Sequence, residues 1–133
     1  MAYEIFWYII VCAAVIFYVV LDGFDLGVGM VMPCVRSDYD RRVFLNAIGP
    51  VWDGNAVWMI VIGGALLAGF TPVYASLFSA FYMPFMILIA AIIFRAVSIE
   101  FRSKISHQGW RFFWDWVFSI ASYIMAFLVG IVL

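Results

Sequence analysis

The sequence predicts an all-α integral membrane protein, a four-transmembrane-helix bundle that forms a single membrane domain of residues 1–133. Hydrophobic residues make up 68% of the chain and charged residues 11%, against about 45–50% and about 25% in soluble domains. The apolar residues fall into four runs, each near or above the roughly 20 residues that cross a bilayer. The formal net charge of −1 gives no sign of a nucleic-acid partner, so the natural environment is membrane lipid.

Prolines and polar residues set the expected helix limits. The first helix is predicted for approximately residues 5–32, because Pro33 cannot continue it. The second is predicted for 47–70, ended by Thr71 and Pro72. The third is predicted for 73–97, with a kink at Pro84, and the fourth for 110–133.

Basic residues predict the orientation of these helices. They occur in only two segments, one after the first helix and one around the connection between the third and fourth: Arg36, Arg41 and Arg42, then Arg95, Arg102, Lys104 and Arg111. The positive-inside rule places both segments in the cytoplasm and both termini outside. The first 35 residues contain no Lys or Arg, which argues against a cleavable signal peptide.

Two cysteines are expected to be free, buried thiols. On one helix, Cys12 and Cys34 would lie roughly 33 Å apart at about 1.5 Å per residue, which is far beyond disulfide reach.

Acidic residues inside the apolar runs are the first candidates for a functional site. A charge at the centre of a membrane helix costs about 2.5–3.5 kcal/mol on insertion scales. Asp22 and Asp25 are three residues apart and therefore share a helix face. Gly23 and Gly27 form a small-xxx-small pair that lets another backbone approach closely. The two acids either fix packing as a buried polar pair or relay protons from the cytoplasmic side.

A third acid, Asp53, follows Gly49 and Pro50 at the start of the second helix. Pro50 is expected in the first turn, where its missing N–H is no loss. Asp53 then lies near the positive end of the helix dipole, where it acts as a dipole partner or cap or as part of a proton relay.

Most basic residues at the cytoplasmic rim are expected to be snorkelling anchors. Arg95 is the exception, because it directly follows an apolar run and could pair with Asp25 or Asp53. Asp115, between Trp114 and Trp116, is expected in an interfacial aromatic belt.

Residues suited to a redox centre are scarce. The single histidine, His107, falls in a predicted cytoplasmic connection, and the methionines are more typical of packing than of haem ligation. The pattern contains no Cys/His metal cluster, no phosphate-binding loop and no nucleophile–base pair.

Several short motifs in this order closely resemble subunit II of the cytochrome bd-type quinol oxidase, over essentially the whole chain. The two aspartate motifs are highly specific. The matching segments are Leu21–Met30, Gly49–Asn55, Val57–Trp58, Phe81–Tyr82, Phe94–Arg95, Glu100–Lys104, Trp110–Arg111 and Trp114–Asp115.

The resemblance implies a haem-free subunit of a terminal oxidase in the bacterial cytoplasmic (inner) membrane. Its partner, subunit I, carries haem b and haem d, oxidises quinol and reduces O₂ to water. The resemblance makes Asp25 and Asp53 candidates for a cytoplasmic proton path. It also implies a structural quinone as a bound group. Five further residues are then candidates for supporting the proton path or contacting this quinone: Asp22, Trp52, Asn55, Arg95 and Glu100.

Two departures from the family pattern are visible. The family continues into a second bundle, whereas this sequence stops at Leu133 within an apolar run, so it is interpreted as a split, truncated or fragmentary subunit II. A separate second half and a small accessory subunit are then further expected partners. Ala56 replaces the Glu or Gln usual after the Trp-Asp-Gly-Asn motif, which removes one polar group beside Asp53.

Two other hypotheses remain open from the residues alone. One is a free-standing four-helix membrane proton or ion carrier, or an assembly protein, since four helices already form a closed bundle. The other is a structural role in which the acids serve only packing.

Overall fold

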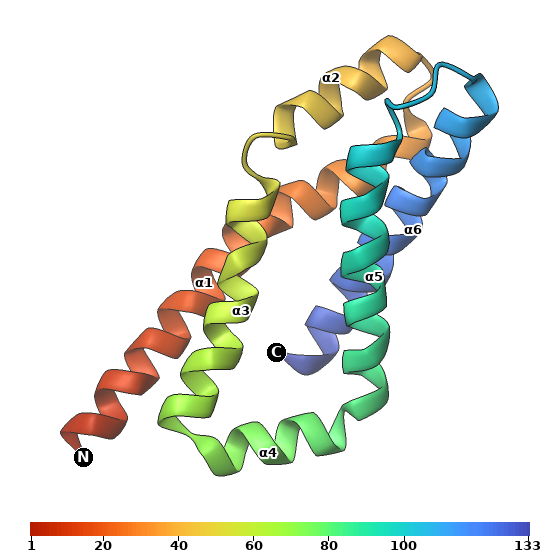
Figure 1. Ribbon diagram of the computed structural model, residues 1–133. Coiled ribbons are helices and arrows are strands. Elements are labelled where there is room, and N and C mark those ends of the chain that lie inside the picture. Colours follow the sequence, from red (N-terminus) through yellow and green to blue (C-terminus); the bar gives the residue numbers. More distant parts are fainter. The chain divides into compact units, whose positions relative to one another are not determined.

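The computed structural model describes all residues 1–133, and every regular element is a helix (Figure 1). The elements are α1 (Ala2–Val31), η1 (Met32–Cys34), α2 (Asp38–Ile48), α3 (Trp52–Gly69), α4 (Thr71–Ala80), α5 (Tyr82–Phe101) and α6 (Gln108–Val132). Four of them are long and apolar enough to cross a membrane: α1, with η1 extending it, α3, α5 and α6. The predicted all-α fold with four membrane-spanning helices is confirmed.

The helix before α3 was not predicted. Ser37 caps α2, because its hydroxyl accepts a hydrogen bond from the Asp40 N–H at 3.5 Å. Acidic residues in the first turn add a favourable interaction with the helix dipole. Residues 47 and 48, expected in the second transmembrane helix, belong to α2 instead.

Pro50 separates α2 from α3. A proline has no N–H for the Asn46 carbonyl, and its ring crowds that position, so α2 ends at Ile48. The N-cap of α3 is Val51. Pro50 therefore precedes this helix rather than lying in its first turn, which corrects the sequence prediction.

The predicted third helix, 73–97, is two helices in the structure. α4 ends at Ala80 and α5 begins at Tyr82, with Phe81 between them. Pro84 cannot bond back to the Ala80 carbonyl, but the first-turn N–H groups of a helix have no intrahelical partner anyway. A new helix start therefore accommodates this proline, in place of the expected kink.

The chain falls into two compact units, and each is described by itself. The first comprises Met1–Phe24 and Val51–Tyr82, that is, most of α1 together with α3 and α4. The second comprises Asp25–Pro50 and Met83–Leu133, that is, the end of α1 with η1, α2, α5 and α6. The single membrane domain predicted from the sequence stays a prediction.

Helices α1 and α3 run antiparallel in the first unit. The Tyr3 hydroxyl donates to the Ala68 carbonyl at 3.1 Å, near the start of α1 and the end of α3. Towards the other end, the rings of Phe17 and Trp58 stack with centroids 4.7 Å apart. α4 turns away from α3 at Phe70 (Figure 1).

The second unit has a small apolar core and a close helix contact. The core consists of Val28, Met32, Leu45, Ile48 and Phe118. A Cβ added at Gly29 would lie 2.6 Å from Ser122 Cβ, so only glycine allows α1 and α6 this approach. At Gly23 and Gly27 an added Cβ would meet no atom within 4 Å. The close helix contact within this unit is therefore at Gly29, and the predicted approach of another backbone at Gly23 and Gly27 stays a prediction.

The thiols are free, as predicted, but they are not buried. Cys34 is exposed at the end of η1 and Cys12 is half-buried on α1. Pro33 ends the apolar helix just before Cys34, which places this thiol beyond the packed segment.

Candidate functional site: buried acids and an ionic cluster

Both aspartates of α1 are completely buried. Asp22 and Asp25 have 0% exposure, although the helix around them carries many exposed apolar side chains. Their three-residue spacing on a continuous α1 supports the predicted shared face. Burying two carboxylates in an apolar helix is costly, so these positions are the clearest candidates for function in the chain.

Arg95 is buried as well, with 2% exposure on α5. Its guanidinium carbon lies 6.0 Å from the centroid of the Phe118 ring on α6, within the range of a cation–π interaction. The sequence correctly singled out Arg95 as an arginine inside the packed region rather than at the rim. It belongs to the same unit as Asp25.

Asp53 is exposed and is the second residue of α3. No side chain caps this helix, so the cap interpretation of Asp53 is wrong, whereas its predicted place beside the positive end of the dipole is correct. Trp52 and Asn55 are half-buried next to it. The Asn55 amide donates to the Leu21 carbonyl at 3.4 Å, which ties this turn to the α1 residue before Asp22.

Two further positions carry weaker evidence. Glu100 is exposed near the end of α5. Ala56 is half-buried on α3 and presents no polar group beside Asp53. The roles of all seven candidate site residues stay predictions: Asp22, Asp25, Trp52, Asp53, Asn55, Arg95 and Glu100.

Sequence reasoning missed an ionic cluster in the second unit that joins α2, the end of α5 and the start of α6. Its members are Asp38, Arg41, Arg102, Arg111 and Asp115. Arg102, only 1% exposed, is the central residue, because it pairs with both carboxylates. Its Nε donates to Asp115 Oδ1, and its Nη2 donates to Asp115 Oδ2 at 3.2 Å and to Asp38 Oδ1 at 2.7 Å.

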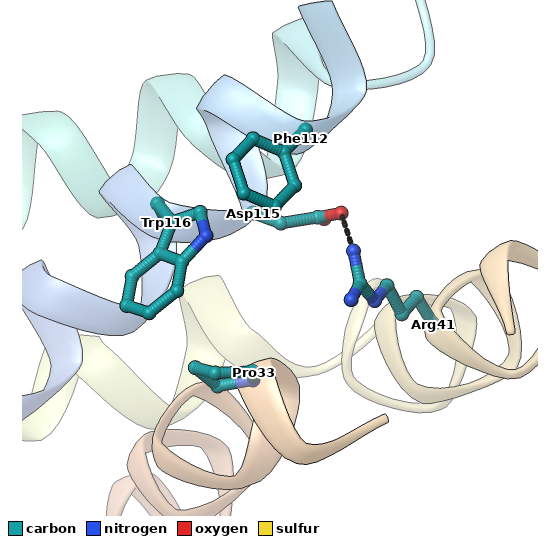
Figure 2. A pocket seen from close by; sticks show the side chains of 5 residues that line it. All are labelled: Pro33, Arg41, Phe112, Asp115 and Trp116. Atoms are coloured by element: carbon teal, nitrogen blue, oxygen red, sulfur yellow. Dashed lines mark hydrogen bonds and ion pairs between the residues drawn. The ribbon is translucent and has the colours of Figure 1, made fainter. Parts of the chain in front are cut away.

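Two other arginines complete the ionic cluster. Arg41 Nη1 donates to Asp115 Oδ2 at 3.0 Å and its Nε to the Val35 carbonyl at 2.7 Å. Arg111 Nη1 donates to Asp38 Oδ2 at 2.9 Å. Figure 2 shows Arg41 and Asp115 pointing toward each other beside Pro33 and the rings of Phe112 and Trp116, around a cavity of about 50 Å³.

The ionic cluster corrects one expectation and adds to another. Asp115 is 5% exposed and ion-paired, and its expected place in an interfacial aromatic belt stays a prediction. Arg102 is buried, rather than a snorkelling anchor. A sequence signal existed in the Asp38–Arg41 and Arg111–Asp115 spacings, but only the fold brings the two segments together.

The charges in the ionic cluster reinforce one another. Partial burial opposes ionisation of Asp38, but the hydrogen bonds and positive charges of Arg102 and Arg111 outweigh it and hold the pKa of this carboxyl below its usual value. Burial likewise opposes the charge on Arg102, but its carboxylate partners Asp115 and Asp38 raise the pKa of the guanidinium. Both groups are therefore charged at neutral pH.

The side chains do not group into a metal site. No three His, Cys, Asp or Glu residues lie close enough together to hold a metal ion. His107 is exposed, and its Nδ1 accepts a hydrogen bond from the Gly109 N–H at 3.1 Å, so it serves as the N-cap of α6.

These features define a class: an all-helical membrane protein with carboxylates and an arginine buried among its apolar helices. The chain belongs to the family of cytochrome bd terminal oxidase subunit II, whose family model matches residues 3–133. The predicted family is confirmed.

Curated relatives agree with this assignment. The chain is 43% identical over 126 residues to cytochrome bd-I ubiquinol oxidase subunit 2 of Escherichia coli K12. It is 40% identical to cytochrome bd ubiquinol oxidase subunit 2 of Bacillus subtilis and 37% identical to a probable cytochrome oxidase subunit 2 of Haemophilus influenzae. In each case 94% of this chain is covered, but the chain spans only 33%, 37% and 33% of these relatives.

Proposed function

We propose that the chain acts as a haem-free subunit of a cytochrome bd-type terminal oxidase, in which quinol oxidation is coupled to O₂ reduction to water. Family membership over residues 3–133 supports the oxidase role. The observation that carries a specific role for this chain is the complete burial of Asp22 and Asp25 within a membrane-spanning helix. Apolar side chains at these two positions would pack without the desolvation cost that a carboxylate carries.

The proposed contribution is a proton path that enters from the cytoplasm. Asp53, exposed at the start of α3, accepts protons from water, and the buried Asp25 holds them inside the apolar layer. A carboxylate can take up and release a proton without moving its backbone, which suits it to relay work in an apolar barrier. Asn55 positions the Asp53 turn through its bond to the Leu21 carbonyl.

The remaining candidates support this path. Asp22 adds a second buried acid three residues before Asp25. Arg95 supplies a buried positive charge in the same unit as Asp25. Trp52 and Arg95 are also the proposed contacts of a structural quinone, and Glu100 lies at the cytoplasmic end of α5.

The proposal requires partners. Haem b and haem d are supplied by subunit I, against which the exposed apolar faces of this chain pack. A separate second half of subunit II and a small accessory subunit are further proposed partners. The proposed location is the bacterial inner membrane with the N-terminus outside, supported by the one-sided distribution of basic residues.

The experiment is affinity purification of the tagged chain from its native membranes, followed by haem spectra and O₂ consumption with quinol. We expect co-purification of a haem-bearing subunit and quinol-dependent O₂ consumption. Asp25→Asn should keep the haem content but lower turnover per haem. Asp40→Asn, an exposed acid on α2, is the matched control and should keep full turnover. A stable, colourless homo-oligomer would instead support the free-standing carrier.

A further inference from the structure

A charged groove in the second unit is not used by the proposed proton path. It has a volume of about 600 Å³ and lies between the start of α2, the α5–α6 connection and the first turns of α6. Its lining includes the arginines Arg36, Arg41 and Arg111, together with Ser106 and Gln108. We propose that this groove binds the phosphodiester headgroup of an anionic phospholipid.

The charge balance of the groove favours an anion. Its two carboxylates, Asp38 and Asp115, are both ion-paired with the buried Arg102. Counting Arg102 with the lining arginines gives four positive charges against two negative charges, an excess of two. One phosphodiester of charge −1 lowers this excess without displacing an existing ion pair.

Donors in the groove remain available to a ligand. Arg36 is exposed and makes no ion pair within the chain. Arg111 uses Nη1 for Asp38, and its side chain is 22% exposed. The hydroxyl of Ser106 and the amide of Gln108 line the same groove. Guanidinium and hydroxyl groups are the usual donors to phosphate oxygens.

The position of the groove selects a lipid rather than a soluble phosphate compound. It lies where α5 ends at Phe101 and α6 begins at Gln108, which is the level at which headgroups meet these membrane-spanning helices. Phe112, which lines the groove, and Phe113 are each 55% exposed and continue from it along α6. α2 presents the exposed apolar residues Val43 and Phe44 within one turn of the groove residue Arg41. The surroundings therefore suit an acyl chain below a bound phosphate.

Native mass spectrometry of the chain, purified from membranes with the subunits it retains, tests this site. The probes are phosphatidylglycerol and phosphatidylcholine with identical acyl chains. Arg36→Gln is the test variant, because it removes a charge from the groove without breaking an ion pair. Arg42→Gln is the matched control, because Arg42 is exposed nearby but does not line the groove.

We expect tighter binding of phosphatidylglycerol than of phosphatidylcholine. Arg36→Gln should weaken phosphatidylglycerol binding roughly fivefold, which corresponds to about 1 kcal/mol per surface arginine, and Arg42→Gln should leave it unchanged. Equal weakening by both variants would overturn the proposal in favour of diffuse surface charge. Absence of a preference for phosphatidylglycerol would overturn it as well.

A further arm separates the lipid from free phosphate. Inorganic phosphate and chloride are added at matched ionic strength, and the bound phosphatidylglycerol is counted. Equal effects of the two salts support a lipid site. Selective displacement by phosphate would assign the groove to a soluble phosphate ligand and overturn the lipid assignment.

Discussion

Arg102 and Asp115 form a bidentate ion pair in which the guanidinium nitrogens Nε and Nη2 both donate to the carboxylate, and the two side chains are only 1% and 5% exposed. The pair joins the residue after α5 to the second turn of α6. Asp38 on α2 accepts from the same Arg102 Nη2. One buried arginine therefore links α2, the end of α5 and the start of α6.

Loss of the Arg102 guanidinium should be strongly destabilising. Arg102→Gln leaves Asp115 buried with a weaker set of partners, and removal of one member of a buried pair typically costs about 3–5 kcal/mol. Thermal unfolding of the detergent-solubilised protein measures the effect. Lys104→Gln, an exposed neighbour, is the control and should change stability by less than about 0.5 kcal/mol. Equal stability of the two variants would contradict a structural role for the ionic cluster.

Acid should weaken the ionic cluster through Asp38. The folded pKa of Asp38 is lower than its usual 3.8, so the unfolded state binds more protons in the window below that value. The stabilising contribution is complete above the usual carboxyl pKa and is lost as the pH falls through the folded pKa. The stability difference between the wild type and Asp38→Asn should therefore shrink as the pH drops toward and below 3.8. A difference that grows on acidification would contradict the sign of this shift.

Substitutions of three glycines separate packing within the chain from packing against a partner. Gly29→Ala should cost about 1–3 kcal/mol, because the added Cβ overlaps Ser122. Gly23→Ala and Gly27→Ala meet no atom of this chain and should not destabilise it. If subunit I approaches at that pair, these two variants should lower co-purification of the haem-bearing subunit. Normal recovery of the partner would place the interface on another face.

Membrane orientation can be read from impermeant thiol reagents in a Cys34→Ser background. Cysteines at Ser106 and Thr71, both exposed, lie at opposite ends of predicted spans. Ser106→Cys should react only from the cytoplasmic side and Thr71→Cys only from outside. Reaction of Ser106→Cys from outside would reverse the orientation, and with it the side from which the acids receive protons.

Asp53→Asn distinguishes a relay from a helix-dipole partner. Asn cannot release a proton, and a positioned acid–base group typically contributes about 10²–10⁴-fold to a rate. The variant complex should keep its haem content but consume O₂ more slowly per haem. A dipole role alone predicts unchanged turnover and a stability loss of about 0.3–1 kcal/mol. Unchanged turnover with normal haem content would remove Asp53 from the proposed path.

The sequence by itself determined the all-helical membrane fold, the family and the candidate acids. Long apolar runs must form helices in lipid, where backbone groups bond only within the segment. Because a charge in such a run is costly, Asp22, Asp25 and Arg95 can be identified as candidates from the sequence alone. Helix limits near Pro50 and Pro84 could not be derived from the sequence, because a proline allows either a kink or a new helix start.

Only the tertiary structure decided which polar residues meet. Arg102 and Asp115 are 13 residues apart, and Arg102 and Asp38 are 64 apart. No local periodicity links such positions, since helical spacing relates only residues three or four apart. The close approach of Gly29 to Ser122, 93 positions further along the chain, was likewise decided by the fold. Burial and pairing of charges depend on the neighbours that folding supplies, and hydropathy along the chain does not contain that information.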